Sequence, residues 1–150
     1  MYRRQGLKGM ASIQRFEDIA AWQKGRELTR QVYQLTNRDK FRHDFTLKDQ
    51  IKRAAISIPS NIAEGFERGG NREFVQFLSV AQGSAAELKS QLYIALDAEY
   101  INKQEFDDLY RQAHSIVLLL AGFIRYLKQS ELRGQKFKAG PVQQTVNRER

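Results

Sequence analysis

Basic residues at helical spacing are the side chains of this sequence most able to do chemistry. Residues four apart lie on one face of a helix, so a pair of Lys or Arg at that spacing can contact neighbouring phosphates of a nucleic acid. The candidate nucleic-acid-binding residues are three such pairs and one neighbour: Arg26 with Arg30, Lys48 with Lys52, Arg68 with Arg72, and Arg53. The alternative is that these charges only solvate helix exteriors, since the sequence shows no interleaved aromatic residues and no nucleic-acid-binding motif.

Catalytic constellations are not apparent. The chain has no cysteine, which excludes disulfides, thiolate nucleophiles and cysteine-ligated metals. His43 and His114 lack the spacing of a zinc protease or a di-iron site, so we interpret them as structural. Asp107 and Asp108 are neighbours that would point about 100° apart on a helix, which disfavours a shared proton. We therefore expect no enzyme activity, no metal and no cofactor.

Four segments with a hydrophobic period of 3.6 residues must position these side chains. They cover about residues 18–37, 45–65, 71–96 and 104–127. In the first segment Trp22 is predicted to lie on the core stripe. No segment alternates as a strand would, and the short connections favour antiparallel neighbours. The predicted fold is all-α, an antiparallel up-down-up-down four-helix bundle.

Proline and glycine mark two local features of the second helix. Pro59 lacks an N–H, which normally costs about 3 kcal/mol in a helix interior. Ser57, Ser60 and Asn61 can bond the freed backbone groups, so we predict one continuous, bent helix rather than two helices. Gly65 is predicted to end this helix in the left-handed conformation.

The charge of the chain, +8 at pH 7, is unevenly distributed. Most of it lies in residues 1–14, predicted to be a flexible arm, and in residues 128–150, predicted to be a disordered basic tail. The bundle itself is predicted to occupy residues 15–127. Within it, residues 13–72 carry 12 basic and 8 acidic side chains, whereas residues 73–127 carry 4 and 7. The two halves are therefore electrostatically complementary.

The fourth helix is apolar on more than one face. Leu118, Leu119 and Tyr126 lie outside its core stripe, which predicts an interface with another subunit. Scattered exposed leucines are the alternative explanation. The longest apolar run, residues 116–122, is far shorter than the roughly 20 residues of a membrane span, and no N-terminal stretch resembles a signal peptide. We therefore expect a cytoplasmic protein without membrane contact.

Two longer phrases give a more specific signal. One is SIPSNIAEG at Ser57–Gly65, followed by GS-x-x-EL at Gly83–Leu88, and the other is RFEDIAAWQKGRELTRQVYQLT at Arg15–Thr36. Over residues 15–127 the chain resembles the bacterial four-helix-bundle proteins encoded in intervening sequences of 23S ribosomal RNA genes. The signature positions, interpreted as interhelical polar contacts and close packing, are Ser57, Pro59, Asn61, Glu64, Gly65, Gly83, Ser84 and Glu87.

The resemblance implies a closed homopentamer, similar to the accessory variability proteins of diversity-generating retroelements, which bind a reverse transcriptase and nucleic acid. Three functions remain open at this point. The first is a homo-oligomer of the intervening-sequence type that binds RNA or DNA through its basic surfaces. The others are an accessory variability protein that binds reverse transcriptase and RNA, and a purely structural protein-interaction module.

Overall fold

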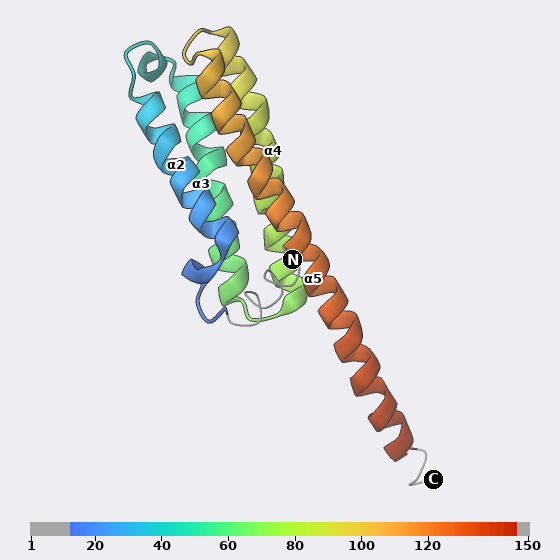
Figure 1. Cartoon of the computed structure of the whole chain (residues 1–150). Coiled ribbons are helices and arrows are strands. Elements are labelled where there is room, and N and C mark those ends of the chain that lie inside the picture. The colour runs from blue at the N-terminus through green and yellow to red at the C-terminus, as the bar shows by residue number, and fades with distance from the viewer. Residues whose placement is uncertain (1–12, 147–150) are drawn as a thin grey trace.

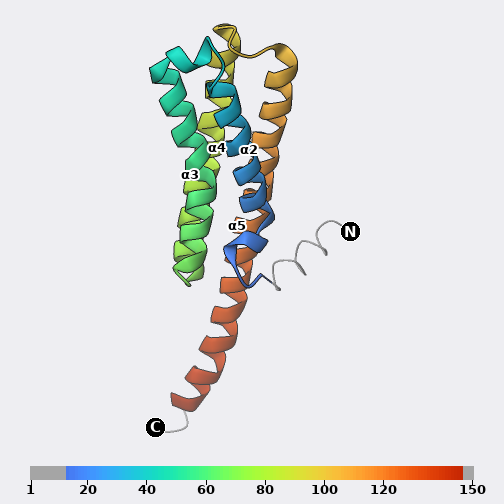
Figure 2. The same cartoon turned by 90° about the vertical axis from the view of Figure 1, so that its left-hand side faces the viewer.

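The computed structural model describes residues 13–146, and the side chains of residues 13–131. Its elements are η1 (Phe16–Asp18), α2 (Ala20–Thr36), η2 (Phe41–His43), α3 (Phe45–Glu67), α4 (Asn71–Asp97) and α5 (Lys103–Val146). The four α-helices lie side by side and alternate in direction, and α2 packs against both α3 and α5 (Figures 1 and 2). The predicted antiparallel four-helix bundle is confirmed.

α5 is longer than the sequence analysis predicts. Its backbone remains helical to Val146, beyond the ends of the other three helices (Figure 1), whereas a disordered tail is predicted from residue 128. Good helix formers follow Leu127, and no glycine or proline interrupts them before Gly134. The predicted arm, residues 1–14, lies outside the described residues except for its last two, as do residues 147–150 of the tail.

One stripe of each helix forms the core. Its largest fully buried aliphatic side chains are Leu28 and Val32 on α2, Ile51, Ile58 and Ile62 on α3, Leu78, Leu88 and Leu92 on α4, and Ile116 and Leu120 on α5. Trp22 is not among them. It is partly buried and packs on Phe16 with ring centroids 5.1 Å apart, because Ala21 and Gly25 take the buried positions of this turn. Trp22 therefore lies at the edge of the core stripe.

α3 runs through Pro59 without a break, and α2 compensates for the missing N–H. The carbonyl of Ala55, which would accept that N–H, lies 3.0 Å from Thr29 Oγ1 of α2. The same hydroxyl lies 2.7 Å from the carbonyl of Gly25. Gly25 permits this approach, because a Cβ there would come within 3.0 Å of Ile58 Cγ2. The single hydroxyl proton is shared between these two carbonyls, so the contact between helices replaces part of the bond that α3 loses at Pro59.

Gly65 does not end α3, so that prediction is wrong. The helix continues to Glu67, and the left-handed residue is Gly69, with φ 81°. Gly65 is instead buried against α4. A Cβ at this position would lie 2.6 Å from Phe77 Cβ and 2.9 Å from Phe74 Cδ1, distances that atoms in proteins do not adopt. Glycine is required here because the two helices are in contact.

The start of α3 is held by Asp44. Its carboxylate accepts hydrogen bonds from the Leu47 N–H at 3.0 Å and from the Tyr100 hydroxyl at 2.9 Å. The bond to Asp44 raises the pKa of Tyr100. Phe41 of η2 stacks on Tyr100 with ring centroids 4.9 Å apart. These contacts connect the first turn of α3 to the turn between α4 and α5.

Candidate nucleic-acid interface

The bundle separates its charges between two sides. α2 and α3 lie next to each other and belong to the half with 12 basic and 8 acidic side chains. α4 and the first part of α5 belong to the half with 4 basic and 7 acidic side chains. The α2 and α3 side of the bundle is therefore net positive, and the opposite side is net negative.

Two lysines of α3 lie over exposed aromatic rings. Lys52 Nζ is 4.5 Å from the ring centre of Tyr33 on α2, and Lys48 Nζ is 4.7 Å from the ring centre of Phe45. Tyr33 is 40% exposed and Phe45 is 65% exposed. Cation–π attraction holds each ammonium group beside its ring. This interleaving was not predicted from the sequence, although the three-residue spacing of Phe45 and Lys48 could have indicated it.

The two arginines of α2 differ in their surroundings. The Arg26 guanidinium lies 5.8 Å from the ring centre of Trp22. Arg30 forms a two-point ion pair with Glu27, through Nη2 and through Nε at 2.9 Å. The hydrogen bond from Arg30 lowers the pKa of Glu27 to about 2, so Glu27 is ionised at neutral pH and compensates the charge of Arg30. Arg26 is the more available of the two for a phosphate.

The other predicted basic residues lie elsewhere. Arg53 is exposed on α3, and Arg72 is exposed in the first turn of α4. Arg68 follows the end of α3, where it pairs with Glu64 at 3.0 Å. Because a helix rises 1.5 Å per residue, Arg68 is about 30 Å along the axis from Lys48. The structure therefore divides the predicted set into two groups.

Three of the seven predicted residues, Arg26, Lys48 and Lys52, lie beside aromatic rings. We call these three residues and their rings the α2–α3 face: Trp22, Arg26, Tyr33, Lys48, Lys52 and Phe45. Thr29 and the α2 members of this face lie on one stripe of α2, and Ala55 and the α3 members lie on one stripe of α3. The two stripes are adjacent, because the Thr29 hydroxyl contacts the Ala55 carbonyl. Where side chains are described, none of the three basic residues of this face forms an ion pair. Lys48 Nζ does donate a hydrogen bond to the Arg42 carbonyl at 3.3 Å, but no carboxylate compensates its charge.

Comparison with known proteins gives the family. Residues 17–122 match the model of the 23S rRNA-intervening sequence proteins. The chain belongs to this family. A solved structure of a protein of unknown function from Bacteroides thetaiotaomicron, of the S23 ribosomal protein family, superposes with a TM-score of 0.64. It is 23% identical and covers 70% of this chain and 98% of its own, a likeness that shows the fold alone. None of the curated proteins is significantly similar.

Several signature residues of this intervening-sequence protein join α3 to α4. Ser57 Oγ lies 2.8 Å from Ser84 Oγ, and the Asn61 amide donates to Ser57 Oγ, also at 2.8 Å. Gly65 lies in the same interface, as described above, whereas Pro59 faces α2. These residues hold the scaffold together and are not part of the α2–α3 face.

The remaining signature residues face solvent. Glu64 pairs with Arg68, and Glu87 accepts a hydrogen bond from the Gln91 amide at 3.1 Å. A Cβ at Gly83 would have no atom within 4 Å, so close packing inside this bundle does not explain that glycine.

The predicted interface residues of α5 differ in exposure. Leu118 is 60% exposed, whereas Leu119 and Tyr126 are partly buried against the core of their own bundle. All three were predicted to be uncovered, because hydrophobic periodicity does not locate the edge of a buried stripe to within one residue. Of the three, Leu118 alone is mostly exposed.

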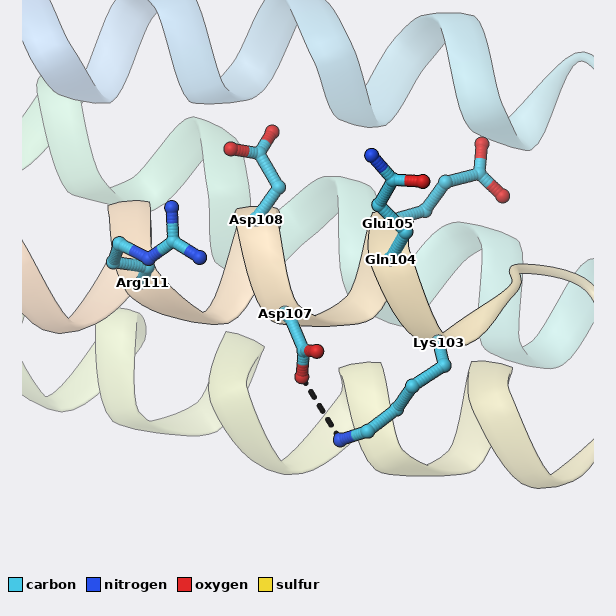
Figure 3. A pocket seen from close by; sticks show the side chains of 6 residues that line it. All are labelled: Lys103, Gln104, Glu105, Asp107, Asp108 and Arg111. Carbon is cyan, nitrogen blue, oxygen red and sulfur yellow. Dashed lines mark hydrogen bonds and ion pairs between the residues drawn. The ribbon is translucent and has the colours of Figure 1, made fainter.

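Polar side chains line a shallow hollow at the start of α5 (Figure 3): Lys103, Gln104, Glu105, Asp107, Asp108 and Arg111. Asp107 and Asp108 point to different sides of the helix, and Asp107 pairs with Lys103 at 2.8 Å. Among the described residues, no three His, Asp or Glu side chains come together as a metal site would require. None of the described helices has both the length and the apolarity of a membrane span.

Proposed function

We propose that this intervening-sequence protein is a non-enzymatic homo-oligomer that binds nucleic acid through its α2–α3 face. The observation that carries the proposal is the row of unpaired cations Arg26, Lys52 and Lys48 on the basic side of the bundle. Phosphate contacts by such cations release counterions, which makes binding favourable and dependent on salt. The acidic opposite side favours one orientation of the protein on a polyanion.

Titration with a structured RNA at two salt concentrations tests this function. If the three cations each contact one phosphate, affinity falls about 20- to 40-fold between about 50 and 200 mM salt. The double variant Lys48→Gln/Lys52→Gln should bind more weakly and with a shallower salt dependence. The matched control is Arg111→Gln/Arg125→Gln, which removes the same charge from exposed positions of α5. Absence of binding at low salt, or an equal loss in the control, contradicts the proposal.

The exposed side of α4 supports the oligomeric part of the proposal. Val80, Tyr93 and Ile94 are 51–52% exposed, and Leu118 of α5 is 60% exposed. Glu87 is the single charged residue among the exposed positions from 74 to 96. A second copy of this chain, packed on this side, would bury the apolar side chains and leave the α2–α3 face free. The preferred count of five copies rests on the family resemblance.

Light scattering at micromolar concentration checks the assembly. We expect a mass several times 17.4 kDa. Leu118→Asp should reduce it towards the mass of one chain, because the substitution places an unpaired charge in the proposed interface. Ile56→Asp, at a position of α3 that is 41% exposed, is the control and should leave the mass unchanged. A wild-type mass of one chain contradicts the assembly.

A further inference from the structure

Two exposed rings of the α2–α3 face have no role in the core. Phe45 is 65% exposed, more than any other large hydrophobic side chain described, and Tyr33 is 40% exposed. Contacts to phosphates need cations and do not need rings. An exposed ring next to a cation instead matches both parts of a nucleotide, since the ring offers a surface to the base and the cation meets the phosphate.

We infer that the α2–α3 face binds single-stranded nucleic acid, with unpaired bases stacked on Tyr33 and Phe45 and with phosphates held by Lys48 and Lys52. This inference rests on the proposed nucleic-acid function and adds the class of ligand. Each lysine has a long flexible stem, so its ammonium group can leave the ring face for a phosphate while remaining beside the stacked base.

The geometry gives the face a direction along the bundle axis. From Trp22 to Tyr33, eleven residues of α2 rise about 16 Å, and from Lys52 to Phe45, seven residues of α3 continue for about 10 Å. The two stretches join where Lys52 lies over Tyr33. The face is thus about 27 Å long, which accommodates roughly eight nucleotides at the 3.4 Å spacing of a stacked strand. Along it each of the three cations lies beside one of the three rings.

Acidic side chains close to this face leave its positive charge largely intact. Glu27 is paired with Arg30, and the Asp44 carboxylate accepts bonds from Leu47 and Tyr100. Asp49 is the remaining exposed carboxylate on this part of α3. Its single negative charge is smaller than the total positive charge of the three cations of the face, Arg26, Lys48 and Lys52.

A duplex does not match the same surface. Its bases are stacked on one another, so an exposed ring cannot reach a base face unless the strand is unpaired. Aromatic stacking gives affinity with little dependence on sequence, because every base has a π face. Dependence on the two rings therefore distinguishes a single strand from a duplex, whereas dependence on the lysines does not.

The test compares a labelled oligouridine of about 12 nucleotides with an RNA duplex of equal length, by fluorescence anisotropy at about 50 and 200 mM salt. We expect the single strand to bind at least about tenfold more tightly than the duplex. Tyr33→Leu/Phe45→Leu should lower affinity for the single strand about tenfold or more and leave duplex affinity unchanged. Both substitutions keep apolar bulk at exposed positions, and circular dichroism verifies the fold.

The control variant is Tyr110→Leu, which removes a ring of α5 that lies 4.8 Å from Lys89 Nζ and belongs neither to the α2–α3 face nor to the proposed subunit interface. It should not alter affinity for either RNA, and light scattering verifies that its assembly is that of the wild type. Equal wild-type affinity for strand and duplex, or no effect of the Tyr33 and Phe45 substitutions, overturns the inference while the nucleic-acid function stands. If neither RNA binds at the lower salt concentration, both fail.

Discussion

α3 meets α4 through small residues, whereas α2 meets α5 through long polar side chains. Gly65 leaves no space for a Cβ next to Phe77, and Ser57 lies 2.8 Å from Ser84. Between α2 and α5, the amides of Gln31 and Gln112 exchange hydrogen bonds of 2.9 and 3.2 Å near the surface. The α3–α4 contact is fixed by shape, while the α2–α5 contact can adapt by side-chain rotation.

This difference bears on the α2–α3 face. α2 is held to α3 through Gly25, Thr29 and Pro59, which again is a contact between small groups. Both contacts of α3 are therefore close, and the position of Lys52 over Tyr33 depends on one of them. Substitutions at the close contacts should cost most, and substitutions between α2 and α5 should cost least.

Gly65→Ala is expected to have the largest effect. The added Cβ would be 2.6 Å from Phe77 Cβ, so α3 and α4 must separate along the interface that also contains Ser57 and Ser84. Overpacking of this kind costs about 1–3 kcal/mol, and backbone displacement places this case at the upper end. Urea denaturation should show a loss of about 2 kcal/mol or more in the free energy of unfolding.

Gly83→Ala is the matched control, because it makes the same change inside a neighbouring helix. No atom lies within 4 Å of the added Cβ, so the expected result is a gain of about 0.5–1 kcal/mol from helix propensity. If Gly65→Ala also stabilised the protein, the close contact between α3 and α4 would be disproved. If Gly83→Ala instead weakened assembly, Gly83 would lie in the subunit interface.

Much of this fold could be predicted from the sequence, because hydrophobic periodicity locates buried stripes and short connections limit topology. The role of Gly65 could not, since a glycine near the end of a helix also suits a left-handed cap. Which role it has depends on the distance to α4. Trp22 fits the spacing of the core stripe, but its position one residue from Ala21 leaves it at the edge.

The candidate interface was predictable only in part. Its basic residues follow from spacing on single helices, but the pairing of Tyr33 with Lys52 joins two helices. That pairing depends on how α2 and α3 are rotated about their axes, which Gly25 and Pro59 determine together. The ion pair between Arg30 and Glu27 was visible as a three-residue spacing, yet its two-point geometry was not.

Thr29→Val should have an intermediate effect. It removes the hydroxyl that bonds the Ala55 carbonyl and leaves that buried acceptor without a partner. The expected loss is about 1–2 kcal/mol. In a Pro59→Ala background residue 59 regains its N–H and can bond Ala55, so the same substitution should cost less. A double-mutant cycle measures this coupling, and additive costs would show that Thr29 does not compensate for Pro59.

Glu105→Gln should have the smallest effect, because it lies at the adaptable contact. Glu105, at the start of α5, pairs with Arg38, which follows the end of α2 and has a side chain that is 50% exposed.

The hydrogen bond from Arg38 lowers the pKa of Glu105 below its ordinary 4.5. The ionised form is therefore favoured by folding, and the stabilisation is complete above pH 4.5 and disappears as pH falls through the lowered pKa. Exposure and salt screening limit it to below about 1 kcal/mol at neutral pH. Urea denaturation across this pH range should show wild type and variant converging under acidic conditions. The variant keeps the bonds to Asn102, so a difference that persists there would mean that the charge of Glu105 is not what stabilises the fold.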